Sequence, residues 1–252
     1  MENLKNILIK LKELGCSGIK ISYEDEGALL NEIISMRYLT ACIGIKLAIK
    51  IGGCEAKRDI VDCLNISCDS IVAPMIESEF ALNKFSKALS QYNYTGEKGF
   101  NLETINGYNN LDEISNEFIN IDYVTFGRVD FVNSLKKDRN FVNDEIIYNM
   151  VSKVFTKAKD QNKMCYLGGA VSIDSKQFIK KLIDNNLLDK FETRYIIFDI
   201  QKINIENLED LLVWANIFEV EWLKFISERY SVLYSKDINR IKMIEDRINK
   251  CK

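Results

Sequence analysis

The chain has 252 residues, of which 47% are hydrophobic and 28% are charged, and its 34 Lys and Arg against 37 Asp and Glu give a formal net charge of -3. This composition is typical of a soluble globular protein and excludes a disordered chain. The near-balanced charge offers no basic field for nucleic acid or an anionic membrane, and no apolar run approaches the roughly 18 residues of a membrane span.

The N-terminal segment MENLKNILIKLKELG predicts an amphipathic helix, and its acidic residues distinguish it from a secretion signal. We therefore expect a cytoplasmic protein. Seven cysteines are scattered without a CxxC pair, which does not indicate a disulfide framework. The seven are Cys16, Cys42, Cys54, Cys63, Cys68, Cys165 and Cys251, and most of them are expected to be small core residues.

Short β-rich runs then alternate with longer helical runs. The predicted strands are 17–24, 46–53, 70–77, 98–104, 122–128, 164–169 and 193–200, and the predicted helices are 28–43, 56–66, 79–92, 108–119, 144–161 and 173–187. This alternation predicts parallel βαβ units. The strands are short and apolar nearly throughout, which favours a TIM-type (β/α)8-like barrel. An open doubly wound sheet is the alternative, but no GxGxxG loop follows the first strand. One of eight strands is missing, cryptic or irregular.

Residues 205–250 are wholly helical in pattern and rich in aromatic residues. No Pro, Gly or Ser-rich linker precedes them, so we expect residues 1–252 to form one barrel domain with a helical C-terminal extension. The extension is interpreted either as a cap on its own barrel or as an oligomer interface. The second interpretation depends on the aromatic surface offered by Trp214, Phe218, Trp222 and Tyr230.

Polar side chains gather where the predicted strands end, at the end of a (β/α)8 barrel that carries the active site. Glu103 and Asp130 are one βα repeat apart, so we expect them on adjacent strand ends. Two carboxylates with water can hold Mg²⁺ or Mn²⁺ and leave positions open for substrate oxygens. A metal so bound stabilises the enolate of a 2-oxo acid. Solvated loop charges are the alternative interpretation.

The chain contains no His, which excludes the commonest general base and imidazole metal ligands. Glu55, at the start of a predicted helix, is our candidate substitute as acid or base, with a pKa raised by burial if the mouth closes. It is otherwise a first-turn carboxylate. Lys50 ends a strand and is interpreted either as an electrostatic partner of a carboxylate or as a Schiff-base nucleophile. The nearby Glu103 and Asp130 favour the metal mechanism.

Three further strand-end features are less specific. Gly168 and Gly169, in the run GGAVS, predict an anion site, although a Gly-rich turn with a Ser N-cap gives the same pattern. Pro74 and Met75 are expected to shape the end of strand 70–77. Arg194 lies at the start of strand 193–200 and is expected to be structural.

The runs IVAPMIES (71–78), FNLETINGYNNLDEI (100–114), GRVDFVNSL (127–135) and LGGAVS (167–172) resemble successive strand ends of one family. It is the HpcH/HpaI aldolase and citrate lyase beta-subunit family, part of the phosphoenolpyruvate/pyruvate barrel superfamily. The resemblance covers roughly residues 17–200. It implies that Glu103 and Asp130 bind the divalent metal and that the backbone amides of Gly127, Arg128 and Val129 receive the pyruvate carboxylate. The run ISYEDEG (21–27) is similar to the acidic strand end of citrate lyase beta subunits, which places Glu24 and Asp25 at the same mouth.

The resemblance implies a metal-dependent carbon-carbon lyase of the class II pyruvate aldolase type. It would act through a pyruvate-like enolate on a 2-oxo acid and an aldehyde, as a homo-oligomer, because the family commonly exchanges C-terminal helices. Two departures are evident: Lys50 stands where the family has an Arg, and the His of the aldolase branch has no counterpart. The alternatives are a citramalyl- or malyl-CoA-type ester lyase, for which no adenine or pantetheine site is recognisable, and a non-catalytic barrel that binds a small acid.

Overall fold

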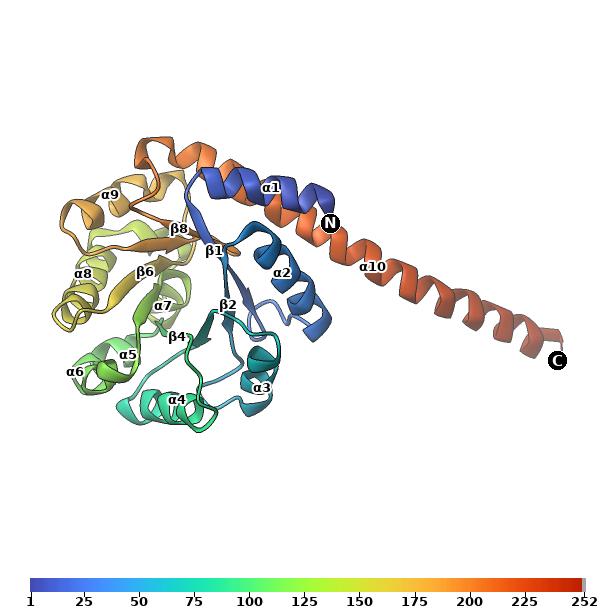
Figure 1. The fold of residues 1–252 in the computed structure, drawn as a ribbon, viewed down its shortest axis with the longest axis horizontal. Coiled ribbons are helices and arrows are strands. Elements are labelled where there is room, and N and C mark those ends of the chain that lie inside the picture. The colour runs from blue at the N-terminus through green and yellow to red at the C-terminus, as the bar shows by residue number, and fades with distance from the viewer. Residues whose placement is uncertain (251–252) are drawn as a thin grey trace.

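A computed structural model describes residues 1–250, with the side chains of all but residues 233, 236 and 247–250, and Cys251 lies outside this range. It shows a closed barrel of eight strands (Figure 1). In chain order they are β1 (Cys16–Ser22), β2 (Lys46–Lys50), β3 (Ser70–Ala73), β4 (Glu97–Leu102), β5 (Tyr123–Gly127), β6 (Met164–Gly168), β7 (Lys190–Glu192) and β8 (Ile196–Asp199). The predicted TIM-type fold is confirmed.

Helices surround the barrel, as the alternating pattern predicts. They are α1 (Glu2–Glu13), α2 (Leu30–Ile43), α3 (Lys57–Asn65), α4 (Glu79–Gln91), α5 (Ile105–Asn109), α6 (Leu111–Ile114), α7 (Arg128–Ser134), α8 (Glu145–Lys159), α9 (Lys176–Asp184) and α10 (Leu208–Lys250). Four 3₁₀ turns add to them: η1 (Ser115–Asn120), η2 (Arg139–Asn143), η3 (Ile173–Ser175) and η4 (Ile205–Asn207). No helix in the described part of the chain is long and apolar enough to cross a membrane.

The strand that sequence reasoning failed to count is β7, a three-residue strand with a charge at each end. It pairs in parallel with β6, whereas β8 runs antiparallel to both β7 and β1 and closes the barrel. The predicted strand 193–200 therefore begins with a reverse turn, in which the Ile196 amide donates to Thr193 Oγ1 at 3.1 Å. This turn places Arg194 at the carboxyl end of β7, whereas the start of a parallel strand at residue 193 would lie at the opposite end of the barrel.

The barrel interior is divided into an apolar half and a polar half. Ala48, Val72, Tyr123, Tyr166 and Ile197 form a buried cluster inside the barrel, where the two tyrosine rings stack with centroids 4.2 Å apart. Interior positions nearer the carboxyl ends of the strands carry charged and amide side chains instead, among them Lys20, Lys50 and Asn101. The apolar half closes one end of the barrel, and the polar half opens into a cavity.

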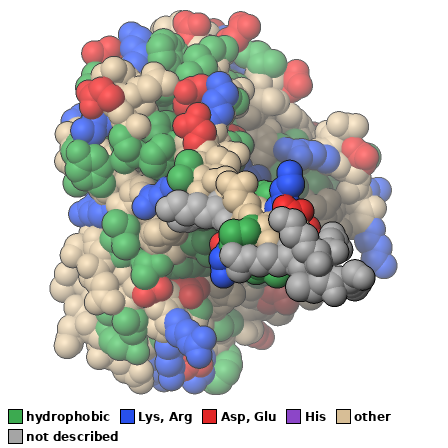
Figure 2. Space-filling model, turned by 90° about the vertical axis from the view of Figure 1, so that its right-hand side faces the viewer, with side chains coloured by type: hydrophobic (Ala, Val, Ile, Leu, Met, Phe, Trp, Pro, Cys, Tyr) green, Lys and Arg blue, Asp and Glu red, His purple; other side chains and the backbone are tan. Residues whose placement is uncertain are grey.

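The long helix α10 first covers its own barrel and then projects beyond it (Figure 1). Phe218 and Trp222 are buried, so two of the four aromatic residues that suggested an oligomer interface pack within the same chain. Farther along, large apolar side chains are exposed: Val232, Tyr234, Ile238, Ile241 and Ile244. Figure 2 shows the face from which α10 projects, where hydrophobic side chains lie among charges of both signs.

Candidate active site at the strand ends

A cavity of about 600 Å³ lies at the carboxyl ends of the strands. The sequence-predicted residues Lys50, Glu103 and Asp130 all line it, and so do four of the predicted backbone positions, namely Gly127, Val129, Gly168 and Gly169. The structure also adds residues that sequence reasoning did not assign to the site: Lys20, Glu26, Asn101, Arg139, Glu192 and Arg194.

Glu103 is the most constrained carboxylate of the cavity. It follows β4 directly and is only 3% exposed. Its Oε1 accepts a hydrogen bond from the Met75 amide at 2.9 Å, and its Oε2 accepts one from Asn101 Nδ2 at 3.0 Å. Met75 has a φ of 45°, an unusual conformation for a non-glycine residue, and it is this residue whose amide reaches the carboxylate. A Cβ at Gly127 would come within 2.6 Å of Glu103 Oε2, so the neighbouring strand end requires glycine.

Lys50 supplies a buried positive charge beside these carboxylates. Its Nζ lies 2.8 Å from Glu24 Oε2. Burial lowers the pKa of Lys50, but the charges of Glu103 and Glu24 more than offset this, so that the pKa is raised overall. A raised pKa favours the electrostatic interpretation of Lys50 over a Schiff-base nucleophile, which requires a depressed one.

Asp130 lies in the first turn of α7, where its side chain is exposed at the rim of the cavity. Burial raises the pKa of Asp130 and of Glu103, Lys50 opposes both shifts, and the charge of Asp130 raises the pKa of Glu103 further. The two carboxylates therefore carry like charge in one partly desolvated space, which a cation would stabilise.

Within the described residues no group of three or more His, Cys, Asp and Glu side chains is arranged to hold a metal. A two-carboxylate site therefore needs further oxygen ligands. Asn101 Oδ1 is buried in the cavity lining without a hydrogen-bond partner, so a third protein oxygen is available. This donor set fits a hard cation such as Mg²⁺, which usually keeps several waters and binds through one or two carboxylates.

The backbone just after β6 approaches the first turn of α7 closely. Gly169 has a φ of 79°, and a Cβ on it would lie 2.7 Å from the Arg128 nitrogen and 2.6 Å from the Val129 nitrogen. The close approach of the end of β6 to the first turn of α7 therefore requires glycine at this position.

The side chain of Arg128 points away from the cavity. It is fully buried, and it donates from Nη1 to Asn143 Oδ1 at 2.7 Å and from Nε to the Gly168 carbonyl at 3.2 Å. Its guanidinium also lies over the Phe178 ring. Arg128 thus holds the end of β6 against α7, and it is not among the residues that line the cavity, unlike its neighbours Gly127 and Val129.

Glu24 and Glu55 are not among the residues that line the cavity. Glu24 reaches the site only through its ion pair with Lys50. Glu55 is exposed and pairs with Lys84 at 3.2 Å, which lowers the pKa of Glu55 rather than raising it. The burial expected for an acid or base is absent there, and the structure does not bring Glu55 together with Glu103 and Asp130.

Lys20 and Glu192 form an ion pair of 2.5 Å inside the barrel, on two strands that are not adjacent in sequence. Glu192 is 3% exposed. The signal for Lys20 is its position within an otherwise apolar strand, at the same parity as Gly18 and Ser22, which indicates an interior side chain. Glu192 had no such signal, because β7 was not recognised as a strand.

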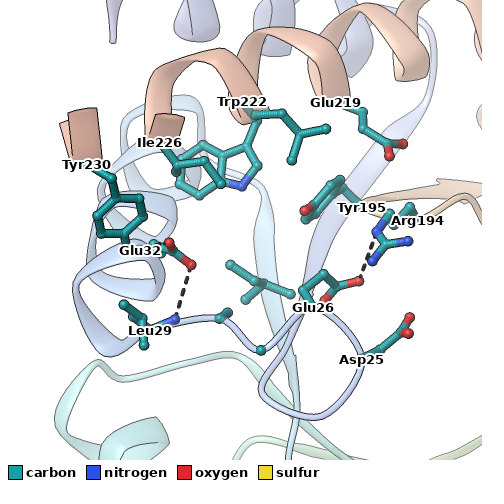
Figure 3. A pocket seen from close by; sticks show the side chains of 14 residues that line it. Asp25, Glu26, Leu29, Glu32, Arg194, Tyr195, Glu219, Trp222, Ile226 and Tyr230 are labelled. Carbon is teal, nitrogen blue, oxygen red and sulfur yellow. Dashed lines mark hydrogen bonds and ion pairs between the residues drawn. The ribbon is translucent and has the colours of Figure 1, made fainter. Parts of the chain in front are cut away.

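Glu26 is the carboxylate that sequence reasoning missed. It lies in the loop after β1, its side chain is 9% exposed, and its Oε1 lies 3.4 Å from Arg194 Nε (Figure 3). Its Oε2 is buried without a hydrogen-bond partner. Burial raises the pKa of Glu26 to about 7, although Lys20 and Arg194 oppose the shift. The run YEDEG contains three adjacent acids, and only the folded loop shows which one turns inward.

The family model described as HpcH/HpaI aldolase/citrate lyase matches residues 35–181, which is more than half of the chain. A search of curated proteins found no match.

Solved structures share the fold at low sequence identity. An HpcH/HpaI aldolase from Desulfitobacterium hafniense DCB-2 is 14% identical, with a TM-score of 0.64 over 77% of this chain and 82% of that one. The citrate synthase SbnG is 13% identical, with a TM-score of 0.60 over 86% of this chain and 98% of that one. RipC from Yersinia pestis is 14% identical, with a TM-score of 0.54 over 77% and 88%.

Proposed function

The chain belongs to the HpcH/HpaI aldolase/citrate lyase family, and from this membership we propose that it is a metal-dependent lyase of the class II pyruvate aldolase type. It cleaves or forms a carbon-carbon bond between a 2-oxo acid and an aldehyde through a pyruvate-like enolate. The observation that carries the proposal is the convergence of Lys50, Glu103 and Asp130 in one cavity at the strand ends.

Glu103 and Asp130 would hold Mg²⁺ or Mn²⁺, with Asn101 Oδ1 as a further oxygen and the remaining positions left to water and substrate. When bound, the ion supplies Lewis-acid polarisation of the 2-oxo group. The Met75 amide and Asn101 Nδ2 fix the Glu103 carboxylate, so the ligand needs little rearrangement on binding.

The chain's own groups bind and orient the 2-oxo acid. The carboxylate of the substrate is assigned to the backbone amides of Gly127, Arg128 and Val129 at the start of α7, where Gly127 and Val129 line the cavity. Lys50 faces the developing enolate with a buried positive charge, and Glu24 keeps its Nζ in place. A fixed cation at a site of developing negative charge lowers the barrier more than the same charge in water.

Glu26 is the group that we assign to proton transfer, in place of a histidine. In the cleavage direction, Glu26 takes the proton from the substrate hydroxyl. The carbon-carbon bond then breaks, and the electron pair of that bond passes to the 2-oxo half, which becomes an enolate. The hydroxyl carbon becomes the aldehyde, and the enolate then takes at carbon the proton that Glu26 removed, which returns Glu26 to its ionised form. A carboxyl group that titrates near neutral pH suits this exchange in both directions.

Exchange of the methyl protons of pyruvate for deuterium tests enolate formation without any aldehyde. In the presence of Mg²⁺ the wild-type chain should exchange these protons, as followed by proton NMR. Asp130→Asn and Lys50→Met should each lower the rate by at least about 100-fold, because the first removes a ligand of the metal ion and the second removes a positive charge that stabilises the enolate. Glu97→Gln, at the opposite end of the barrel, is the control and should exchange at the wild-type rate.

Absence of exchange by the wild-type chain, together with cleavage of malyl-CoA or citramalyl-CoA, would replace the aldolase assignment by the ester lyase. Binding of pyruvate or oxalate with no turnover of any substrate would instead indicate a barrel that only binds small acids. We also propose that the chain is a homo-oligomer, supported by the exposed apolar side chains on the projecting part of α10.

A further inference from the structure

A second cavity, which we call the side chamber, lies beside the strand-end cavity and under α10 (Figure 3). Its volume is about 550 Å³. The side chamber and the strand-end cavity share four lining residues: Asp25, Glu26, Arg194 and Glu219. The ion pair between Glu26 and Arg194 therefore belongs to both spaces, and a ligand bound across it would occupy both.

The walls of the side chamber are apolar on two sides. Trp222 and Ile226 enter it from α10, and Leu29 lies on the opposite side, at the start of α2 (Figure 3). Trp222 is 1% exposed and fixes the back of the space. Ile21 and Leu223 complete the apolar lining. A volume of this size with such walls is suited to a hydrocarbon group rather than to a hydrated ion.

The charged side chains that line the side chamber are mostly negative. Four carboxylates line it, from Asp25, Glu26, Glu32 and Glu219. Among its described lining residues Arg194 is the single cation, and its guanidinium pairs with Glu26. Glu32 accepts hydrogen bonds from the Leu29 amide and from Tyr230. An anionic group placed here would meet like charges and find the guanidinium already engaged.

An unmet hydrogen-bond acceptor lies at the junction of the two cavities. Glu26 is nine-tenths buried, and its Oε2 has no partner within the described chain. A buried acceptor without a donor is costly, and such atoms mark positions that a ligand fills. A hydroxyl at the reacting carbon of a substrate that spans both cavities would provide the missing donor.

We propose that the side chamber binds the half of the substrate that becomes the aldehyde, and that this half is apolar and carries no negative charge. The inference rests on the proposed function, because it assigns the 2-oxo half to the neighbouring strand-end cavity. It adds the chemical class of the aldehyde, which neither the fold nor the family specifies. Phosphorylated and carboxylated aldehydes are accordingly excluded as good substrates.

Two aldehydes of matched shape test this specificity. 4-Methylpentanal and 4-oxobutanoate differ in that an isopropyl group replaces the carboxylate. With pyruvate and Mg²⁺, the wild-type chain should use 4-methylpentanal with a kcat/KM at least about tenfold higher, which corresponds to about 1.4 kcal/mol. An equal or higher kcat/KM for 4-oxobutanoate would overturn the proposal.

A pair of neighbouring variants tests the location. Leu29 lines the side chamber, whereas Leu30 does not, and both are exposed residues at the start of α2. Leu29→Lys adds a cation beside the carboxylates and should lower the preference for 4-methylpentanal by about tenfold. Leu30→Lys adds the same charge outside the chamber and should leave the preference unchanged. Equal effects of the two variants would refute the assignment.

Binding without turnover separates this inference from the proposed function. In the Trp214→Phe background, Trp222 fluorescence should respond to 4-methylpentan-1-ol and not to 4-hydroxybutanoate, and Leu29→Lys should weaken the response to the alcohol. Failure of pyruvate proton exchange would reject the aldolase function while leaving this binding result interpretable. Normal exchange with no fluorescence response and no aldehyde preference would reject the side chamber alone.

Discussion

Replacing Glu26 by Gln should stabilise the protein at alkaline pH and have little effect at acid pH. The folded-state pKa of Glu26 is about 7, against about 4.3 for an unperturbed Glu. For an acid whose pKa is raised on folding, the native state binds more protons than the unfolded state. The free energy of unfolding therefore falls as pH rises from the unfolded pKa through the folded one. Below the unfolded pKa both states are protonated, and the penalty disappears.

The magnitude follows from the size of the shift. Each pKa unit corresponds to about 1.4 kcal/mol, so the ionised Glu26 side chain costs about 3 to 4 kcal/mol above neutral pH. Its side chain is nine-tenths buried, so solvent screens little of this cost. Glu26→Gln removes the charge with almost no change of volume. The difference in free energy of unfolding between Glu26→Gln and the wild type should grow by about 3 kcal/mol in favour of the variant between about pH 4.5 and about pH 8.5.

Urea denaturation of both proteins at several pH values measures this difference, and carbon NMR of the Glu26 carboxyl measures the pKa directly. Glu113→Gln is the control, because Glu113 is an exposed carboxylate of α6 that lines neither cavity and its replacement removes the same charge. A stability difference between Glu26→Gln and the wild type that stays constant across this pH range would refute the reasoning. The same variant should lose turnover, so stability gained and activity lost should appear together.

Other expected outcomes concern the remaining parts of the site and the oligomer. Asp130→Asn should weaken Mg²⁺ or Mn²⁺ binding by at least about tenfold in calorimetry, and unchanged affinity would misplace the metal site. Lys50→Arg should retain part of the turnover that Lys50→Met loses, and a borohydride-trapped pyruvyl adduct on Lys50 would contradict the electrostatic role. Gly169→Ala should raise the KM for pyruvate, since its Cβ would meet the Arg128 and Val129 nitrogens. Truncation after Ser231 removes the projecting part of α10 and should convert an oligomer to a folded monomer in light scattering.

The order of the strands and the main strand-end residues could be predicted from the sequence, because each depends on local pattern. Apolar runs that end in a charged residue placed Lys50 and Glu103 correctly in one cavity. The short strand β7 has no apolar run, so its position depends on pairing with β6, which local pattern does not reveal. Because β7 was not predicted, strand 193–200 was expected to run parallel to its neighbours, and its start, with Arg194, would then lie at the other end of the barrel.

The acidic residues near the mouth show a different limit. Glu24, Asp25 and Glu26 are adjacent and equally polar, yet of the three only Glu26 has a side chain that is nine-tenths buried. Glu55 looked favourable for its place after a strand, but its pairing with Lys84 depends on a distant helix. The burial of a single carboxylate depends on packing between segments that are remote in sequence, so local sequence does not predict which carboxylate is buried.

The reversal between β7 and β8 has a consequence for how this protein can change over generations. Because β8 runs back through the barrel, the chain emerges at the far end and α10 must pass along the outside before its side chains reach the mouth. The groups near the reacting atoms are anchored by hydrogen-bonded strands, whereas Trp222 and Ile226 belong to a single helix added after the barrel is complete. Residues of that helix can be substituted one at a time without disturbing the strand ends. The architecture thus separates a part that must stay fixed from a part free to diversify.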